Sequence, residues 1–314
     1  ALKFLFIIIL CLIGLKDYSY PLGIFIAIFL NMINIYVYFR KSKLNFINAS
    51  INNRLAKIFL IFSIPIMFQN ISSGLLLYLN RFMINSTFNE STVGIFTFLY
   101  SISFSLFLIL MIGSIIFQPF LYRFKSNNDT SENYLMIYTN IIFLIILFFG
   151  VILYFGFNLL NNFYPESYLQ NKTAFVLLLM CMLFWPFYNQ GNFRIMLINK
   201  PYLLPISTAS SALINYFLNI ILLKRYNIEG ASLSFLISTT FLTLLVNLLS
   251  VKSFFSIKNK HSLIMIFIIT ILSCFIVFNN FSNLLPIILI PLIVSSCYEL
   301  YTNKRFVLNL LSNR

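Results

Sequence analysis

Charge is scarce in this chain of 314 residues, of which 9% are charged, against about 25% in an ordinary soluble domain. Hydrophobic residues make up 60% of the chain, and the mean hydropathy is +0.93. A water-soluble core cannot bury apolar surface on this scale, so the sequence predicts a polytopic membrane protein. Continuous apolar runs such as residues 263–278 lack the alternation of membrane β-strands, and helices satisfy their own backbone in lipid. The predicted fold is therefore an all-α transmembrane helix bundle.

Residues that carry catalysis or bind metals are also scarce. The one histidine, His261, lies at a loop edge, and Cys11, Cys181, Cys274 and Cys297 lie in apolar runs without pairing or ligand spacing. The chain has no glycine-rich nucleotide loop, no histidine-rich cluster and no Ser/His/Asp set. We therefore expect no enzyme activity, no cofactor and no metal site.

Ten apolar segments approach the roughly 20 residues that a helix needs to cross a bilayer. The first is short enough to be a truncated or half helix. The predicted spans are residues 3–15, 20–39, 58–80, 93–121, 134–160, 173–198, 202–223, 230–251, 262–279 and 284–301.

Acidic residues are few, and the net charge of +14 comes from basic residues in short loops. Alternating the loops across the membrane places sixteen lysines and arginines on one side and five on the other. The positive-inside rule makes the first side cytoplasmic, together with both termini. The longest loop, residues 40–57, is basic and can lie against anionic lipid headgroups. Topology thus accounts for the charge, and nucleic acid is not an expected partner.

The span that opens near Pro65, where the proline is expected to kink the helix, carries polar groups on an otherwise apolar helix. Gln69 and Asn70 lie deep in it, and Asn80 and Arg81 lie near its outer end. An arginine in lipid costs several kcal/mol unless it reaches the interface or faces a cavity. As a site residue, Arg81 could bind a lipid diphosphate or an acidic sugar, because its guanidinium can donate two parallel hydrogen bonds to a phosphate or carboxylate. The alternatives are a snorkelling arginine and amides that only join helices.

A second candidate site follows from the run WPFYNQGNFR, in which Pro186 is expected to kink a span. Interrupted helices recur where transport sites form. The amides of Asn189 and Gln190 could bond sugar hydroxyls, Trp185 could stack on a sugar face, and Arg194 could bind an anion. The alternative is a kinked packing helix with a snorkelling arginine.

Four stretches carry a resemblance to a known family. They are SIPIMFQNISSGLLLYLNRFMI (63–84), ESTVGIFTFLYSIS (90–103), IIFQPFLYRF (115–124) and YNIEGASLSFLIS (226–238). In order and spacing they resemble the polysaccharide flippases, of the Wzx type, in the multidrug/oligosaccharidyl-lipid/polysaccharide (MOP) exporter superfamily. The sequence departs from the family pattern at position 80, where asparagine stands in place of a frequent acid.

The resemblance implies a division of the chain into four parts. Residues 1–39 would be the last two helices of an N-terminal bundle, and residues 40–57 a cytoplasmic linker. Residues 58–251 would be a six-helix C-terminal bundle of the MATE type, and residues 252–314 two additional helices and a cytoplasmic tail. The chain is thus expected to be an N-terminally truncated fragment.

The function implied by the resemblance is the flipping of undecaprenyl-diphosphate-linked oligosaccharide repeat units for O-antigen or capsule synthesis. The expected location is the bacterial inner membrane, and the expected partners are the lipid-linked oligosaccharide, membrane lipids, and the polymerase and glycosyltransferases of the same pathway. One alternative is a cation-coupled, MATE-like small-molecule exporter, which needs a buried acid. Another is a membrane polysaccharide polymerase, which tends to carry a large external loop that this sequence lacks.

Overall fold

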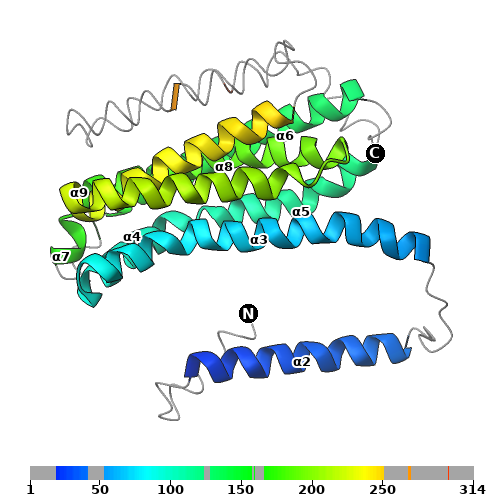
Figure 1. Cartoon of the computed structure of the whole chain (residues 1–314), viewed down its shortest axis with the longest axis horizontal. Helices are drawn as coiled ribbons and strands as arrows, with labels where there is room; N and C mark the ends of the chain where they lie inside the picture. The colour runs from blue at the N-terminus through cyan, green and yellow to red at the C-terminus, as the bar shows by residue number, and fades with distance from the viewer. Residues whose placement is uncertain are drawn as a thin grey trace. The chain divides into compact units, whose positions relative to one another are not determined.

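The computed structural model describes residues 19–41, 53–123, 128–157, 159, 166–250, 268–269 and 296, and these contain helices and no strands. The all-α prediction is thereby confirmed. The helices are α2 (Ser19–Lys41), α3 (Asn53–Thr87), α4 (Glu90–Phe104), α5 (Phe107–Arg123), α6 (Asn128–Phe157), α7 (Glu166–Leu169), α8 (Lys172–Leu197) and α9 (Leu203–Leu249), shown in Figure 1.

The chain divides into two compact units, Ala1–Ile58 and Phe59–Arg314. In the first unit the structure describes α2, whose apolar part, Phe25–Tyr38, is shorter than a membrane span. The second unit contains the candidate functional residues, and its helices α4, α6, α8 and α9 run alongside one another (Figure 1).

Among the described residues, five helical segments are long and apolar enough to cross a membrane. They are Phe59–Thr87, Glu90–Arg123, Ser131–Phe157, Lys172–Leu197 and Leu203–Leu249. The predicted spans 3–15, 262–279 and 284–301 lie outside the described residues, apart from positions 268–269 and 296. The protein is therefore a membrane protein by the length and composition of its helices, and the count of ten spans stays a prediction.

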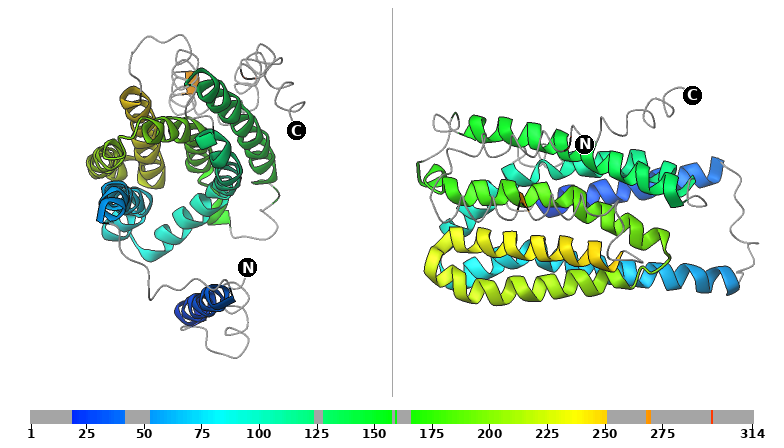
Figure 2. Two further views of the ribbon diagram at one scale, coloured as in Figure 1. Left: turned by 90° about the vertical axis from the view of Figure 1, so that its right-hand side faces the viewer. Right: turned by 90° about the horizontal axis from the view of Figure 1, so that it is seen from above.

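The last of these segments, α9, reverses its direction at Asn227, where φ is 50° and ψ is −130°. Ser211 donates a hydrogen bond to the backbone oxygen of Ser238 at 2.6 Å, which a straight helix of 27 residues could not allow. The two halves thus lie side by side, as Figure 2 shows. A Cβ added at Gly230 would come within 2.1 Å of the Leu222 carbonyl oxygen, so the turn requires glycine there. The predicted spans 202–223 and 230–251 correspond to these halves.

Helix α8 forms the centre of the second unit. All its residues from Ala174 to Gly191 are buried, because α4, α5, α6 and α9 pack around it. A helix that is apolar on every side is expected to be enclosed in this way. Helix α3, by contrast, has few buried side chains, which suits a helix whose apolar surface faces lipid.

The connection between α3 and α4 is a short polar turn. Asn89 caps α4, since its side-chain oxygen accepts a hydrogen bond from the Thr92 backbone nitrogen at 3.1 Å. Glu90 adds a negative charge to the first turn of α4, where it interacts favourably with the positive end of the helix dipole. This cap ends one apolar segment and begins the next, and Tyr100 of α4 lies against Arg81 of α3.

Candidate functional site

A cavity of about 410 Å³ lies between α3 and the junction of α4 with α5. Its lining combines one cation, two serines and a group of aromatic side chains. The lining residues are Leu77, Tyr78, Arg81, Tyr100, Ser101, Phe104, Ser105, Phe107 and Leu108. We call it the Arg81 pocket. Its volume falls in the range of roughly 300–1,000 Å³ that is usual for small-molecule sites.

Arg81 is half-buried in this pocket, and its guanidinium lies over two aromatic rings. Its Cζ is 4.8 Å from the centre of the Tyr100 ring and 5.3 Å from that of Tyr78. Cation–π contacts of this kind stabilise an arginine but leave its N–H groups available. In the part of the chain that the structure describes, no acid lies within ion-pair distance of Arg81, and its buried Nε has no hydrogen-bond partner.

The wall of the pocket contains a helix interruption that the sequence analysis did not predict. The expected span 93–121 divides at Ser105 and Leu106 into α4 and α5. Hydrogen bonds of the i to i−3 type cross the junction, from Leu106 N to Ser103 O at 3.3 Å and from Leu108 N to Ser105 O at 3.1 Å. No proline or glycine lies there, and the signal was instead the run Ser101, Ser103, Ser105.

Each of these three serines donates its hydroxyl to a backbone carbonyl of the preceding turn. The acceptors are the oxygens of Thr97, Leu99 and Ile102, at 2.7, 3.0 and 2.7 Å. Such bonds compete with the helical ladder and bend helices. The local sequence therefore accounts for a break at this depth.

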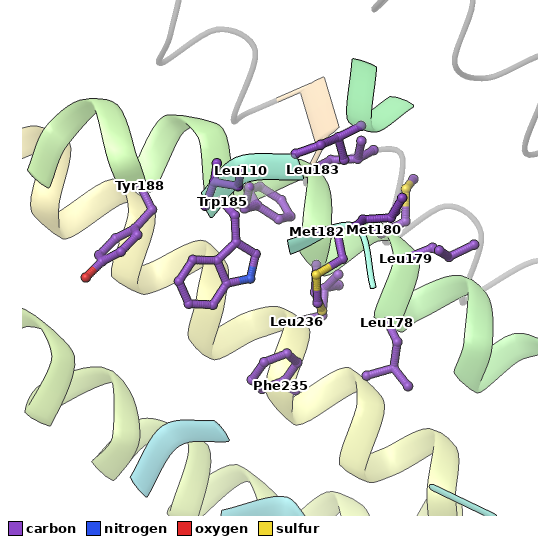
Figure 3. Close-up of a cluster of buried hydrophobic side chains, with 14 of the residues drawn as sticks. Leu110, Leu178, Leu179, Met180, Met182, Leu183, Trp185, Tyr188, Phe235 and Leu236 are labelled. Carbon is purple, nitrogen blue, oxygen red and sulfur yellow. The ribbon is translucent and has the colours of Figure 1, made fainter. Parts of the chain in front are cut away.

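A series of aromatic rings leads from the Arg81 pocket to α8. Tyr100 stacks on Phe104 with ring centres 5.0 Å apart, and Phe104 stacks on Phe107 at 4.7 Å. Phe107 meets the edge of Trp185 at 5.2 Å, and Trp185 meets Tyr188 at 5.2 Å. Figure 3 shows Trp185 and Tyr188 projecting to the same side of α8.

Two predicted site residues lie along this series. Gln69 on α3 donates from Nε2 to the Tyr188 hydroxyl at 2.9 Å, and so joins α3 to α8. Trp185 is buried, and its Nε1 has no hydrogen-bond partner among the described residues. The structure thus connects Gln69 and Trp185 with Arg81 through intervening rings. Asn70, the neighbour of Gln69, is exposed.

Arg194 has surroundings unlike those of Arg81. It is 3% exposed and pairs with Glu132 of α6, with Nη2 2.9 Å from Oε2 and Nε 3.0 Å from Oε1. Its Nη1 donates to Asn247 of α9 at 3.4 Å. Asn247 in turn donates to the Phe187 carbonyl oxygen of α8 at 3.0 Å. The guanidinium of Arg194, which the sequence predicts to contact substrate, is therefore engaged in hydrogen bonds that link α6, α8 and α9.

Asn189 is also engaged in helix packing. Its Nδ2 donates to the Ser114 hydroxyl at 2.6 Å and to the Tyr138 hydroxyl at 3.0 Å, which joins α8 to α5 and α6. Gln190 is fully buried on the same helix. Neither lines the Arg81 pocket.

Asn80 belongs to a buried cluster of amides between α3 and α9. Its Oδ1 accepts a hydrogen bond from Asn219 Nδ2 at 2.6 Å, and Asn215 Nδ2 donates to the Ser238 hydroxyl at 2.9 Å. These groups are uncharged: the first bond joins α3 to the first half of α9, and the second joins the two halves of α9 to each other.

Pro65 and Pro186, which the sequence predicts as kinks, lie inside α3 and α8, and neither helix is interrupted at its proline. Among the described residues, the interruptions occur at Ser105 and at Asn227.

No group of three or more histidines, cysteines or acids is placed to hold a metal in the described part of the chain.

Comparisons with models of protein families, with characterised proteins and with solved structures found no match to this chain. The geometry of the site and the motifs in the sequence are therefore the grounds for a functional proposal.

Proposed function

We propose that this protein is a membrane transporter that flips an undecaprenyl-diphosphate-linked oligosaccharide from the inner to the outer leaflet of a bacterial inner membrane. The product would serve O-antigen or capsule synthesis. The proposal combines the membrane-spanning character of the helices with the four motifs that resemble Wzx-type flippases.

The Arg81 pocket is the observation that carries the proposal. An arginine within a membrane-length helix needs a partner, because lipid cannot solvate its charge. Arg81 lies in the wall of a cavity of about 410 Å³ beside a broken helix, with no acid near it in the described part of the chain. Broken helices beside polar cavities are a recurring form of transport site. A phosphate-bearing substrate supplies the negative charge that this site lacks.

The aromatic lining gives the pocket a second property. Phe104 and Phe107 are half-buried beside Arg81 and present apolar ring surface to the cavity. Sugars bind to such surfaces through their C–H faces, while their hydroxyls reach neighbouring polar groups. A site with one cation and several ring faces suits a sugar phosphate better than a purely apolar substrate.

A cation-coupled exporter, the alternative function, calls for a buried carboxylate that can exchange its cation. Glu132 is partly buried, and its carboxylate is already bonded to Arg194 at 2.9 Å. Asn80, at the position where the family often has an acid, is bonded to another amide. No observation in the described residues favours this alternative.

Complementation of a flippase-null bacterial strain tests the proposal. The full-length protein should restore the surface glycan, and Arg81→Met should not restore it at equal membrane expression. Arg225→Met is the matched control, because Arg225 is an exposed cation at the turn of α9, and it should act like the unchanged protein. Expression without any surface glycan would refute the function, and full activity of Arg81→Met would refute the site.

A further inference from the structure

Hydrogen-bond donors without partners gather around the Arg81 pocket. Among the described residues, Arg81 Nε, the Tyr100 hydroxyl and Trp185 Nε1 are buried and make no hydrogen bond. Arg81 and Tyr100 line the pocket, and Trp185 contacts Phe107 of its wall. Buried polar groups are nearly always paired in folded proteins, so each exception needs an explanation.

Tyr100 is the most informative of the three, because packing does not explain its hydroxyl. The residue is 5% exposed, and its ring packs on Phe96, Phe104 and Phe235 with centres 6.1, 5.0 and 5.8 Å away. A phenylalanine could make each of these contacts and could also carry the guanidinium of Arg81 on its face. Leaving the hydroxyl unpaired costs free energy, so a bound partner is the simplest reason for its presence.

The two serines of the pocket differ from these donors. Ser101 and Ser105 already donate their hydroxyl protons to the carbonyl oxygens of Thr97 and Ile102. They can therefore only accept further hydrogen bonds. The buried donors that remain available in the pocket are thus Arg81 and Tyr100, beside the exposed hydroxyl of Tyr78, and all three are suited to an acceptor-rich, negatively charged group.

We infer that Arg81 and Tyr100 together form a binding site for an oxyanion of the phosphate class, in which the Tyr100 hydroxyl determines affinity beside the arginine. The guanidinium supplies charge and in-plane N–H groups, and the phenol supplies one further hydrogen bond. The serine oxygens and the rings of Phe104 and Phe107 then face the part of the ligand attached to the phosphate. This inference deepens the proposed function. It rests on that function only for the source of the phosphate, which is either a lipid-linked diphosphate or a lipid headgroup.

The test measures binding of inorganic diphosphate to the full-length protein in phosphatidylcholine nanodiscs by titration calorimetry. The unchanged protein should bind the probe saturably, Arg81→Met should abolish binding, and Tyr100→Phe should weaken it by about tenfold, as expected for one hydrogen bond to a charged group. The thermal stability of Tyr100→Phe should be unchanged or higher, because the substitution removes an unpaired buried hydroxyl.

Tyr138→Phe is the matched control. The Tyr138 hydroxyl is buried too, but it is bonded to Ser114 and Asn189 and lies outside the pocket lining. This variant should lose stability and bind diphosphate as tightly as the unchanged protein. Unchanged affinity of Tyr100→Phe, or no diphosphate binding by the unchanged protein, would overturn the inference.

Nanodiscs that contain phosphatidylglycerol distinguish the two sources of phosphate. If the site takes lipid headgroups, the anionic lipid should compete and weaken diphosphate binding, and this effect should disappear in Arg81→Met. If it takes the diphosphate of a transported substrate, binding should be the same in both lipids. Either result supports the oxyanion site, which would stand even if complementation failed.

Discussion

Arg194 and Arg81 lie in membrane-length helices of the same unit and differ in almost every contact. Arg194 is buried in the centre of the bundle, bonded to Glu132 and Asn247. Arg81 lies at the wall of a cavity, in contact with aromatic faces and, within the described residues, with no acid. The same residue type therefore serves a structural link in one place and offers an unpaired charge in the other. We propose that Arg194 serves mainly the stability of the bundle and Arg81 mainly transport.

Removing the partner of Arg194 should have the largest effect on stability. Glu132→Ala leaves a buried guanidinium without its counter-charge, and we expect a loss of about 3 kcal/mol or more in the free energy of unfolding. Reversible unfolding in mixed detergent micelles measures it. Glu132→Leu combined with Arg194→Met should recover most of the loss, because the pair is then replaced by apolar groups. A loss below about 0.5 kcal/mol for Glu132→Ala would show that the pair does not hold the bundle.

Asn247→Leu should have an intermediate effect on the same region. It removes the acceptor of Arg194 Nη1 and the donor to the Phe187 carbonyl oxygen, and we expect a loss of about 1–2 kcal/mol. The same unfolding experiment measures it. If Glu132→Ala and Asn247→Leu were strictly additive, the interpretation of both residues as parts of one network around Arg194 would fail.

Arg81→Met should have a small effect on stability, in contrast with the variants around Arg194. It removes two cation–π contacts worth about 0.5–1 kcal/mol each and also removes the cost of a half-buried charge, so we expect a net change below about 1 kcal/mol. The unfolding free energy, compared with that of Arg194→Met, checks this. A destabilisation by Arg81→Met equal to that by Arg194→Met would mean that both arginines hold the fold.

Asn70→Leu should have the smallest effect. Asn70 is exposed on α3, so its replacement should change stability by less than about 0.5 kcal/mol and leave diphosphate binding unchanged. Its neighbour provides the control, because Gln69→Leu breaks the bond to Tyr188 and should cost about 1 kcal/mol. Equal effects of the two substitutions would contradict the orientation of α3 described above.

Part of the architecture was predictable because long apolar runs and loop charges are local in the sequence. The all-α class and the apolar segments from residue 58 to residue 251 follow from run length alone, and the turn near Asn227 follows from its polar residues. The break at Ser105 was missed because neither proline nor glycine marks it. The three alternating serines were the available signal, and their effect depends on hydroxyls bonding back to the helix.

Of the residues that line the Arg81 pocket, the sequence singled out only the arginine itself. Arg81 stands out because a charge in an apolar run is costly, but Arg194 stands out for the same reason. The sequence does not show which of them has a partner, since Glu132 lies 62 positions from Arg194 and just before the expected span 134–160. Tyr100 was missed because a tyrosine in a chain rich in tyrosine carries no signal. We infer its role from a ring packed on three sides and a hydroxyl without a partner among the described residues.

The amount of surface glycan per molecule of folded Arg81→Met protein, in a flippase-null strain, tests the central claim most directly. The account predicts folded protein at the level of the unchanged chain and a loss of nearly all surface glycan. Surface glycan at the unchanged level, from an equal amount of folded protein, would contradict it.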